Sequence, residues 1–328
     1  MKDNRILWID CVRNIGMWLV VLGHSFCSED LKQYIYSFHM PLFFFLSGIF
    51  WREENYIRFV SHKFKTLIIP YLVFNILVYG LYLLGIIHLF SSDVIWYEPL
   101  LSIVFGYGAL CCHASWFLVC LFIVENIYYG LRKYVRGYFI IILLVGVLGT
   151  YYIPFIKFWD ISIALVGLFF YGLGQVSRKY VYQLASIDIY MICGLAIAVL
   201  LASLYPVYVN GRVDMVFNIY GSNYYLFILN ALLGIVFVLC WGILLNRMLR
   251  NVGASLITYI SKNLILVVLL HPFSNAVIFK FLPYQNDWWN VIISFLSIFL
   301  LIPVIFLIDN VFPWMIGRKI PVYKMKFS

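Results

Sequence analysis

Long apolar runs recur along the whole chain, separated by short breaks that are charged or rich in turn residues. A helix needs about 20 apolar residues to cross a bilayer, so runs of this length are typical of transmembrane helices. The 328 residues are 64% hydrophobic and 11% charged, whereas a soluble domain carries about 25% charged residues. The sequence therefore predicts a polytopic membrane protein, and it excludes a soluble enzyme, a disordered chain and a disulfide scaffold.

The apolar runs predict about ten spans. They lie at 6–27, 38–51, 66–90, 116–131, 138–154, 161–176, 187–205, 224–246, 254–276 and 289–312. Each run is continuously apolar, unlike the alternating strands of a transmembrane barrel. We expect an all-α integral membrane protein: one transmembrane domain over residues 1–328, a bundle of about ten helices with no separate soluble domain.

The basic residues predict the orientation of this bundle. With an even number of spans both termini share one side, and 17 of the 23 Lys and Arg residues fall on that side. The opposite side carries only Lys32, Lys157, Arg212 and Lys280. Because cytoplasmic loops are enriched in Lys and Arg, we expect both termini to be cytoplasmic. The net charge of +9 then reflects topology, and no nucleic-acid partner is expected.

The first run contains three ionisable residues, Asp10, Arg13 and His24. Asp10 and Arg13 inside the run argue against a cleaved signal peptide, so we expect this segment to remain as the first span. At 100° per residue, Arg13 and His24 lie within about 20° of the same helix face and about 16 Å apart along the axis. Ionisable groups inside a span are costly and mark functional candidates. The alternative is a structural ion pair plus a hydrogen-bonded core histidine.

Two further histidines are expected at the level of His24, on the side opposite the termini. His39 opens the short second run, and His271 with Pro272 is expected to end the ninth. A neutral imidazole can accept a hydroxyl proton near pH 7, which favours His24 as a general base and makes His39 a second catalytic candidate. No histidine pair has metal-binding helical spacing, so no metal is expected.

Glu125, in the fourth span, is a buried carboxylate that could bind substrate or pair with a Lys or Arg. The loop expected at 52–65 carries Arg58, Lys63 and Lys65. Such a loop could bind the phosphates of a cytoplasmic ligand, or it could be ordinary positive-inside topology and a contact for anionic lipid.

Five sequence blocks together resemble the acyltransferase 3 family of bacterial integral-membrane O-acyltransferases, in particular its small members that acetylate cell-envelope sugars. The blocks are Asp10-Cys11-Val12-Arg13 leading to His24; Phe38-His39-Met40-Pro41-Leu42-Phe43-Phe44 through Ser47-Gly48; Lys65-Thr66-Leu67-Ile68-Ile69-Pro70-Tyr71; Ser261-Lys262-Asn263-Leu264 through His271-Pro272; and Trp116-Phe117-Leu118. They run from the first span to the ninth, so the resemblance covers essentially the whole chain.

The resemblance implies a ten-helix bundle in the bacterial cytoplasmic membrane. It implies transfer of an acyl group, usually acetyl, from cytoplasmic acyl-CoA as co-substrate to a sugar hydroxyl of a glycan or a lipid-linked precursor, with no permanently bound cofactor. His24 matches the family's essential histidine and Arg13 its arginine partner. The basic residues Arg58, Lys63 and Lys65 would then face CoA, together with Arg13. Glu125, Trp116 and His271 are the candidates for contacts with the acceptor.

A different class of protein also fits these features. A transporter or flippase for a lipid-linked glycan could use the polar face of the first helix as a substrate path. Such a protein would carry out no thioester chemistry and would have no reason to bind CoA. The identity of the acceptor and the oligomeric state leave no mark on the sequence.

Overall fold

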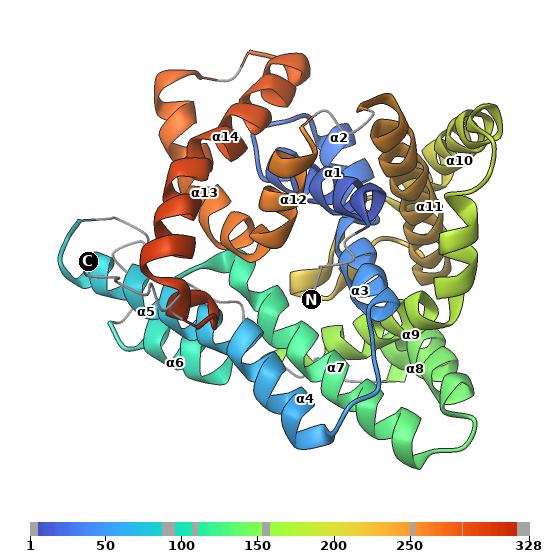
Figure 1. Cartoon of the computed structure of the whole chain (residues 1–328), viewed down its shortest axis with the longest axis horizontal. Coiled ribbons are helices and arrows are strands. Elements are labelled where there is room, and N and C mark those ends of the chain that lie inside the picture. Colours follow the sequence, from blue (N-terminus) through green and yellow to red (C-terminus); the bar gives the residue numbers. More distant parts are fainter. Residues whose placement is uncertain are drawn as a thin grey trace, which may run out of the picture.

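The computed structural model describes residues 6–86, 96–106, 111–152, 158–249, 253–283 and 285–319, and they are mostly helical (Figure 1). The α-helices are α1 (Leu7–Gly23), α2 (Glu29–Tyr36), α3 (His39–Ile49), α4 (Tyr56–Lys63), α5 (Ile69–Leu83), α6 (Glu98–Phe105), α7 (Trp116–Tyr134), α8 (Tyr138–Tyr152), α9 (Ile161–Leu184), α10 (Ile189–Asn210), α11 (Tyr224–Leu249), α12 (Ala254–Lys262), α13 (Leu264–Phe281) and α14 (Asp287–Val311). A two-stranded antiparallel hairpin, β1 (Val213–Asp214) and β2 (Ile219–Tyr220), lies between α10 and α11. The predicted all-α class is confirmed for this part of the chain.

Seven helices within the described ranges are long and apolar enough to cross a membrane. They are Tyr56–Leu83, His113–Tyr134, Ile161–Leu184, Ile189–Asn210, Tyr224–Leu249, Leu264–Phe281 and Asp287–Val311. The predicted spans 6–27, 38–51 and 138–154 correspond to the shorter helices α1, α3 and α8. The ends of the spans predicted at 66–90 and 138–154 lie outside the described residues. So do His88, a further histidine of the span predicted at 66–90, and Lys157. The multi-pass membrane class is supported, while the count of about ten and the side of the termini stay predictions.

The basic segment at 52–65 is not the loop that the sequence predicts. The chain is helical from Tyr56 onwards, through α4, a π-helical turn at Phe64–Ile68 and α5. The side chain of Asn55 starts the helix because its Oδ1 accepts the backbone N–H groups of Ile57 and Arg58 at 3.0 and 3.5 Å. Such capping supplies partners for the N–H groups that a helix start leaves unpaired. The basic residues are therefore spaced along a helix.

The ninth predicted span, 254–276, is also different: it is two helices, α12 and α13, joined at Asn263. Asn263 donates to the carbonyl of Tyr259 and accepts from Arg318, so its side chain stabilises the break. Helix α13 continues to Phe281, so His271 lies within the helix instead of at its end. Pro272 is tolerated inside α13, as prolines are in membrane helices.

Helix α1 lies at the centre of the bundle, where α3, α11, α12, α13 and α14 pack against it (Figure 1).

Glycines allow the closest approaches between helices, as between α3 and α9. A Cβ on Gly48 of α3 would overlap the carbonyl of Tyr171, and a Cβ on Gly174 of α9 would overlap the carbonyl of Phe45. Small residues at such crossings let backbones touch, which membrane helices use in place of a hydrophobic driving force. This contact fixes α3 against α9.

Candidate active site

Three histidines from different elements meet where α1 ends. The rings of His24 and His271 have centroids 5.0 Å apart, and the ring of Tyr36 lies 5.9 Å from His24 and 4.8 Å from His39. His24 is the first residue after α1, Tyr36 ends α2, His39 begins α3, and His271 lies in α13. The structure thus brings together the three histidines that the sequence places at one level, and it adds Tyr36.

Solvent reaches these histidines unequally. His39 and His271 are 4% and 0% exposed, whereas the side chain of His24 is exposed. Nδ1 of His39 lies 3.0 Å from the carbonyl of Ile35, and Nδ1 of His271 lies 2.8 Å from that of Val268. A carbonyl can only accept, so each Nδ1 donates, and in a neutral ring Nε2 is then the acceptor. His24 is therefore the member of the cluster that a reacting hydroxyl can approach.

The end of α1 is held by α13 through Asn275. Its Nδ2 donates to the carbonyls of Val21 and His24 at 3.2 and 3.3 Å, two carbonyls that the helix end leaves without an intrahelical partner. Asn275 follows His271 by four residues, so both side chains lie on one face of α13. Nε2 of His271 is buried and has no hydrogen-bond partner among the described residues. One face of α13 therefore both orients His24 and presents an unused acceptor close to it.

Tyr36 lies outside the predicted spans, between His24 and His39. Burial raises the pKa of its phenol to about 12, and the nearby carboxylate of Asp214 acts in the same direction. The guanidinium of Arg212 lies over the ring, 5.5 Å from the centroid. At neutral pH the Tyr36 hydroxyl is protonated and can donate a hydrogen bond beside the histidines.

Asp10 and Arg13 lie at the other end of α1. Oδ1 of Asp10 accepts from Ser261 Oγ at 2.6 Å and lies 3.8 Å from Arg13. Asp10 is 3% exposed, whereas the Arg13 side chain is 29% exposed. The guanidinium of Arg13 stacks over Phe50, 4.2 Å from the ring centroid. Asp10 and Phe50 thus hold an accessible cation about 16 Å along the helix from His24.

The remaining predicted site residues are Arg58, Lys63, Lys65, Trp116 and Glu125. Nζ of Lys63 lies 2.5 Å from Oε1 of Glu125, so these two residues, predicted for different ligands, form an ion pair. Arg58 and Lys65 are exposed on the helix that replaces the predicted loop. Trp116 is 6% exposed at the start of α7, against Phe117. Its segment reaches α13 through Cys112, whose Sγ contacts the carbonyl of Leu269.

A groove of about 780 Å³ opens at the same end of the bundle as His24. Helices α2, α10, α11 and α14 line it, with Leu200, Leu204 and Phe237 on its apolar wall. Its polar wall carries Asp30 and Asp287, and Oδ1 of Asp287 accepts the backbone N–H of Ser28 at 2.7 Å. The segment from His24 to Ser28 thus connects the histidines to the groove.

Sequence reasoning missed Tyr36, Asn275 and Ser261. The spacing of His271 and Asn275 is a readable signal, because residues four apart share a helix face. Nothing in the sequence pairs Ser261 with Asp10, since 251 residues separate them. Among the described residues, no group of three or more His, Cys, Asp or Glu side chains is arranged to hold a metal ion.

A family model described as an acyltransferase domain matches residues 6–308 of the 328-residue chain. No curated protein and no solved structure matches the chain. The matched region includes α1, the histidine cluster and both ends of the bundle.

Proposed function

The chain belongs to the acyltransferase 3 family, and on that premise we propose that it transfers an acetyl group from cytoplasmic acetyl-CoA to a sugar hydroxyl of a cell-surface glycan or its lipid-linked precursor. Membership of the family makes it a membrane acyltransferase. The donor, the acceptor and the bacterial cytoplasmic membrane belong to the proposal. The observation that carries it is the exposed His24 beside two buried histidines with assigned acceptor nitrogens.

In the proposed reaction His24 is the general base. It takes the proton of the acceptor hydroxyl as the hydroxyl oxygen attacks the thioester carbon, so a C–O bond forms and the C–S bond breaks. The thiolate of CoA leaves, and the proton on His24 returns to it. The ring of Tyr36 lies 5.9 Å from that of His24, and its hydroxyl is the proposed hydrogen-bond donor to the reacting oxygen. Asn275 holds the backbone of His24 through its hydrogen bond to the His24 carbonyl.

Donor and acceptor approach from opposite ends of α1. The cation of Arg13, at one end, attracts the anionic donor, whose long pantetheine arm extends towards His24. The acceptor enters from the groove at the His24 end. There Asp30 and Asp287 can accept hydrogen bonds from sugar hydroxyls, Trp288 and Tyr208 offer aromatic faces, and the apolar wall suits a lipid tail.

Binding and turnover of acetyl-CoA by the detergent-purified protein test this function. His24→Ala should keep saturable binding but lower the release of CoA about 10²- to 10⁴-fold, the usual contribution of a general base. Arg13→Ala should weaken binding. His62→Ala is the matched control, because His62 is an exposed histidine on α4, away from the cluster.

Two results would contradict the proposal. Turnover that is retained in His24→Ala would show that His24 is not the general base. No binding of acetyl-CoA by the folded wild-type protein would favour a flippase, which needs no thioester.

A further inference from the structure

A second cluster of basic and aromatic side chains lines a cavity at the Arg13 end of the bundle. This cavity of about 360 Å³ is built by the segment that follows α3, the last turns of α7 and the start of α8. We call it the 132 pocket, and its lining residues are Trp51, Glu53, Tyr129, Arg132, Lys133 and Tyr138. The hydroxyl of Tyr129 donates to the carbonyl of Glu54 at 2.8 Å, which fixes the segment after α3 against α7.

Arg132 is held in place without a carboxylate. Its guanidinium lies 4.5 Å from the ring centroid of Trp51 and 5.6 Å from that of Tyr138, and it donates to the Tyr138 hydroxyl at 2.7 Å. None of the ion pairs between described residues includes Arg132 or Lys133. A guanidinium has five N–H donors, so an orientation fixed by aromatic rings leaves several of them for an anion.

The family resemblance suggests Arg58, Lys63 and Lys65 for the donor's phosphates, and none of these three lines the 132 pocket. Lys63 is neutralised by Glu125, while Arg58 and Lys65 are exposed on a helix surface. The 132 pocket contains two cations and one carboxylate, Glu53, and keeps a net positive charge. Its aromatic walls favour an anion attached to a flat ring.

The 132 pocket also lies next to Arg13, because both adjoin the end of α3. Arg132 stacks on Trp51, and the preceding residue, Phe50, stacks under Arg13. Two guanidinium groups therefore flank the end of α3 on neighbouring aromatic residues. A ligand with one end in the 132 pocket would pass this point on its way to Arg13 and His24.

We propose that the 132 pocket binds the phosphorylated adenosine end of the acyl-CoA donor, with Arg132 and Lys133 holding the 3′-phosphate. This inference rests on the proposed function, because it takes acyl-CoA as the donor. Pre-ordering of Arg132 by Trp51 and Tyr138 means that less side-chain freedom is lost when the phosphate binds. Bidentate and charge-assisted hydrogen bonds to phosphate then supply the affinity.

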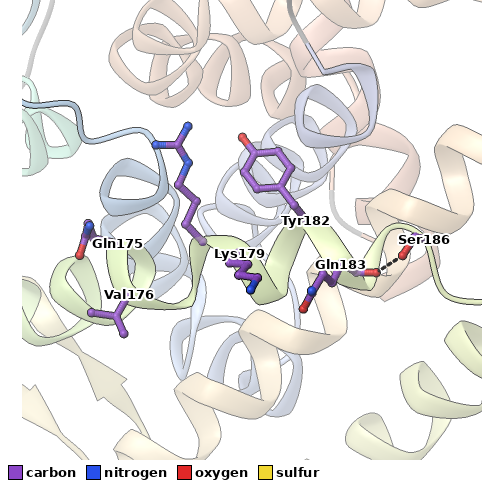
Figure 2. Close-up of a pocket in the computed structure, with 7 residues that line it drawn as sticks. Gln175, Val176, Lys179, Tyr182, Gln183 and Ser186 are labelled. Atoms are coloured by element: carbon purple, nitrogen blue, oxygen red, sulfur yellow. Dashed lines mark hydrogen bonds between the residues drawn. The ribbon is translucent and has the colours of Figure 1, made fainter.

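A cavity elsewhere provides the matched control. It holds about 640 Å³, and its lining runs from Gln175 to Ser186, so α9 and the turn after it form it alone (Figure 2). It carries Arg178 and Lys179, the same pair of cations as the 132 pocket. Because no second element lines this cavity, its cations should not discriminate between forms of CoA.

The experiment compares the affinities of acetyl-CoA and 3′-dephospho-acetyl-CoA, by calorimetry, for the purified full-length protein. The wild type and the control Arg178→Gln should bind acetyl-CoA about 10- to 100-fold more tightly than the dephospho form. Arg132→Gln and Lys133→Gln should each lose most of this preference while their affinity for the dephospho form stays within about twofold. Unchanged dephospho binding also reports that the variants are folded, and Arg132→Lys should recover part of the preference because it keeps the charge.

The possible failures are distinguishable. A wild type that binds both ligands equally, or a preference that persists in Arg132→Gln and Lys133→Gln, overturns the 132 pocket while the proposed function stands. A folded wild type that binds neither ligand overturns the proposed function and the pocket with it.

Discussion

At the residue scale, Lys63 and Glu125 form the ion pair that the sequence offers as one of two roles for Glu125. Glu125 is 1% exposed, and its Oε2 has no hydrogen-bond partner among the described residues. Its carboxylate therefore depends on the Lys63 ammonium 2.5 Å away. Removal of one partner from a buried pair leaves an uncompensated charge, whereas removal of both can be close to neutral.

We accordingly expect Lys63→Met to destabilise the protein by about 3 kcal/mol, because Glu125 would remain buried and unpaired. The double variant Lys63→Met with Glu125→Leu should recover most of this loss. Thermal unfolding in detergent measures both, and the exposed Lys65→Met serves as a control that should change stability by less than about 0.5 kcal/mol. If the double variant is as unstable as Lys63→Met, the loss of stability does not come from an unpaired Glu125 carboxylate.

Single residues also show where sequence reasoning works and where it stops. The spacing within α1 predicts that Arg13 and His24 lie on one face, because a helix fixes angles over short distances. Contacts between distant segments are not encoded in spacing. The pairing of Ser261 with Asp10, or of Lys63 with Glu125, depends on how whole helices pack, and a single sequence gives no sign of it.

At the element scale, α3 and α9 pack so closely that an added methyl group at their contact should lower stability. Gly48 and Gly174 each face a backbone carbonyl of the other helix, which cannot move aside as a flexible side chain can. Gly48→Ala and Gly174→Ala should each destabilise the protein by about 1–3 kcal/mol, the usual cost of overpacking. The melting temperature in detergent measures this change.

Gly194→Ala is the matched control, because Gly194 lies in α10 and a Cβ added there would meet no other atom within 4 Å. Alanine is favoured over glycine inside a helix by about 0.5–1 kcal/mol, so this variant should be neutral or slightly more stable. Equal losses at Gly48 and Gly194 would contradict a specific contact between α3 and α9.

Helices with long apolar runs are predictable from sequence, while their boundaries are not. The apolar runs predicted at 161–176, 187–205, 224–246 and 289–312 all lie in long helices, α9, α10, α11 and α14. The sequence analysis predicts neither the helix that begins at Tyr56 nor the break at Asn263. Each depends on the hydrogen bonds of one asparagine side chain, Asn55 or Asn263. Charge and hydropathy do not report such bonds.

At the scale of the whole molecule, the two ends of the bundle carry different cations. Arg212 contacts Glu29 of α2 at 3.1 Å and lies over Tyr36, so it belongs to the His24 end. Arg178 and Lys179 lie near the other end, where Tyr182 packs against Trp8 at the start of α1. This separation agrees with the sorting of basic residues in the sequence, and the side of each end can be measured.

We expect a membrane-impermeant maleimide, added to right-side-out vesicles, to label Arg212→Cys but not Lys179→Cys until the vesicles are opened. The native cysteines give a low background, because those that the structure describes are buried or, for Cys193, half-buried. Labelling of Lys179→Cys alone would place the His24 end in the cytoplasm and would invert the bundle. If the proposed roles of Arg132 and His24 hold, the donor's phosphates and the general base lie at opposite ends of α1, and the pantetheine arm would carry the acetyl group along this helix to His24.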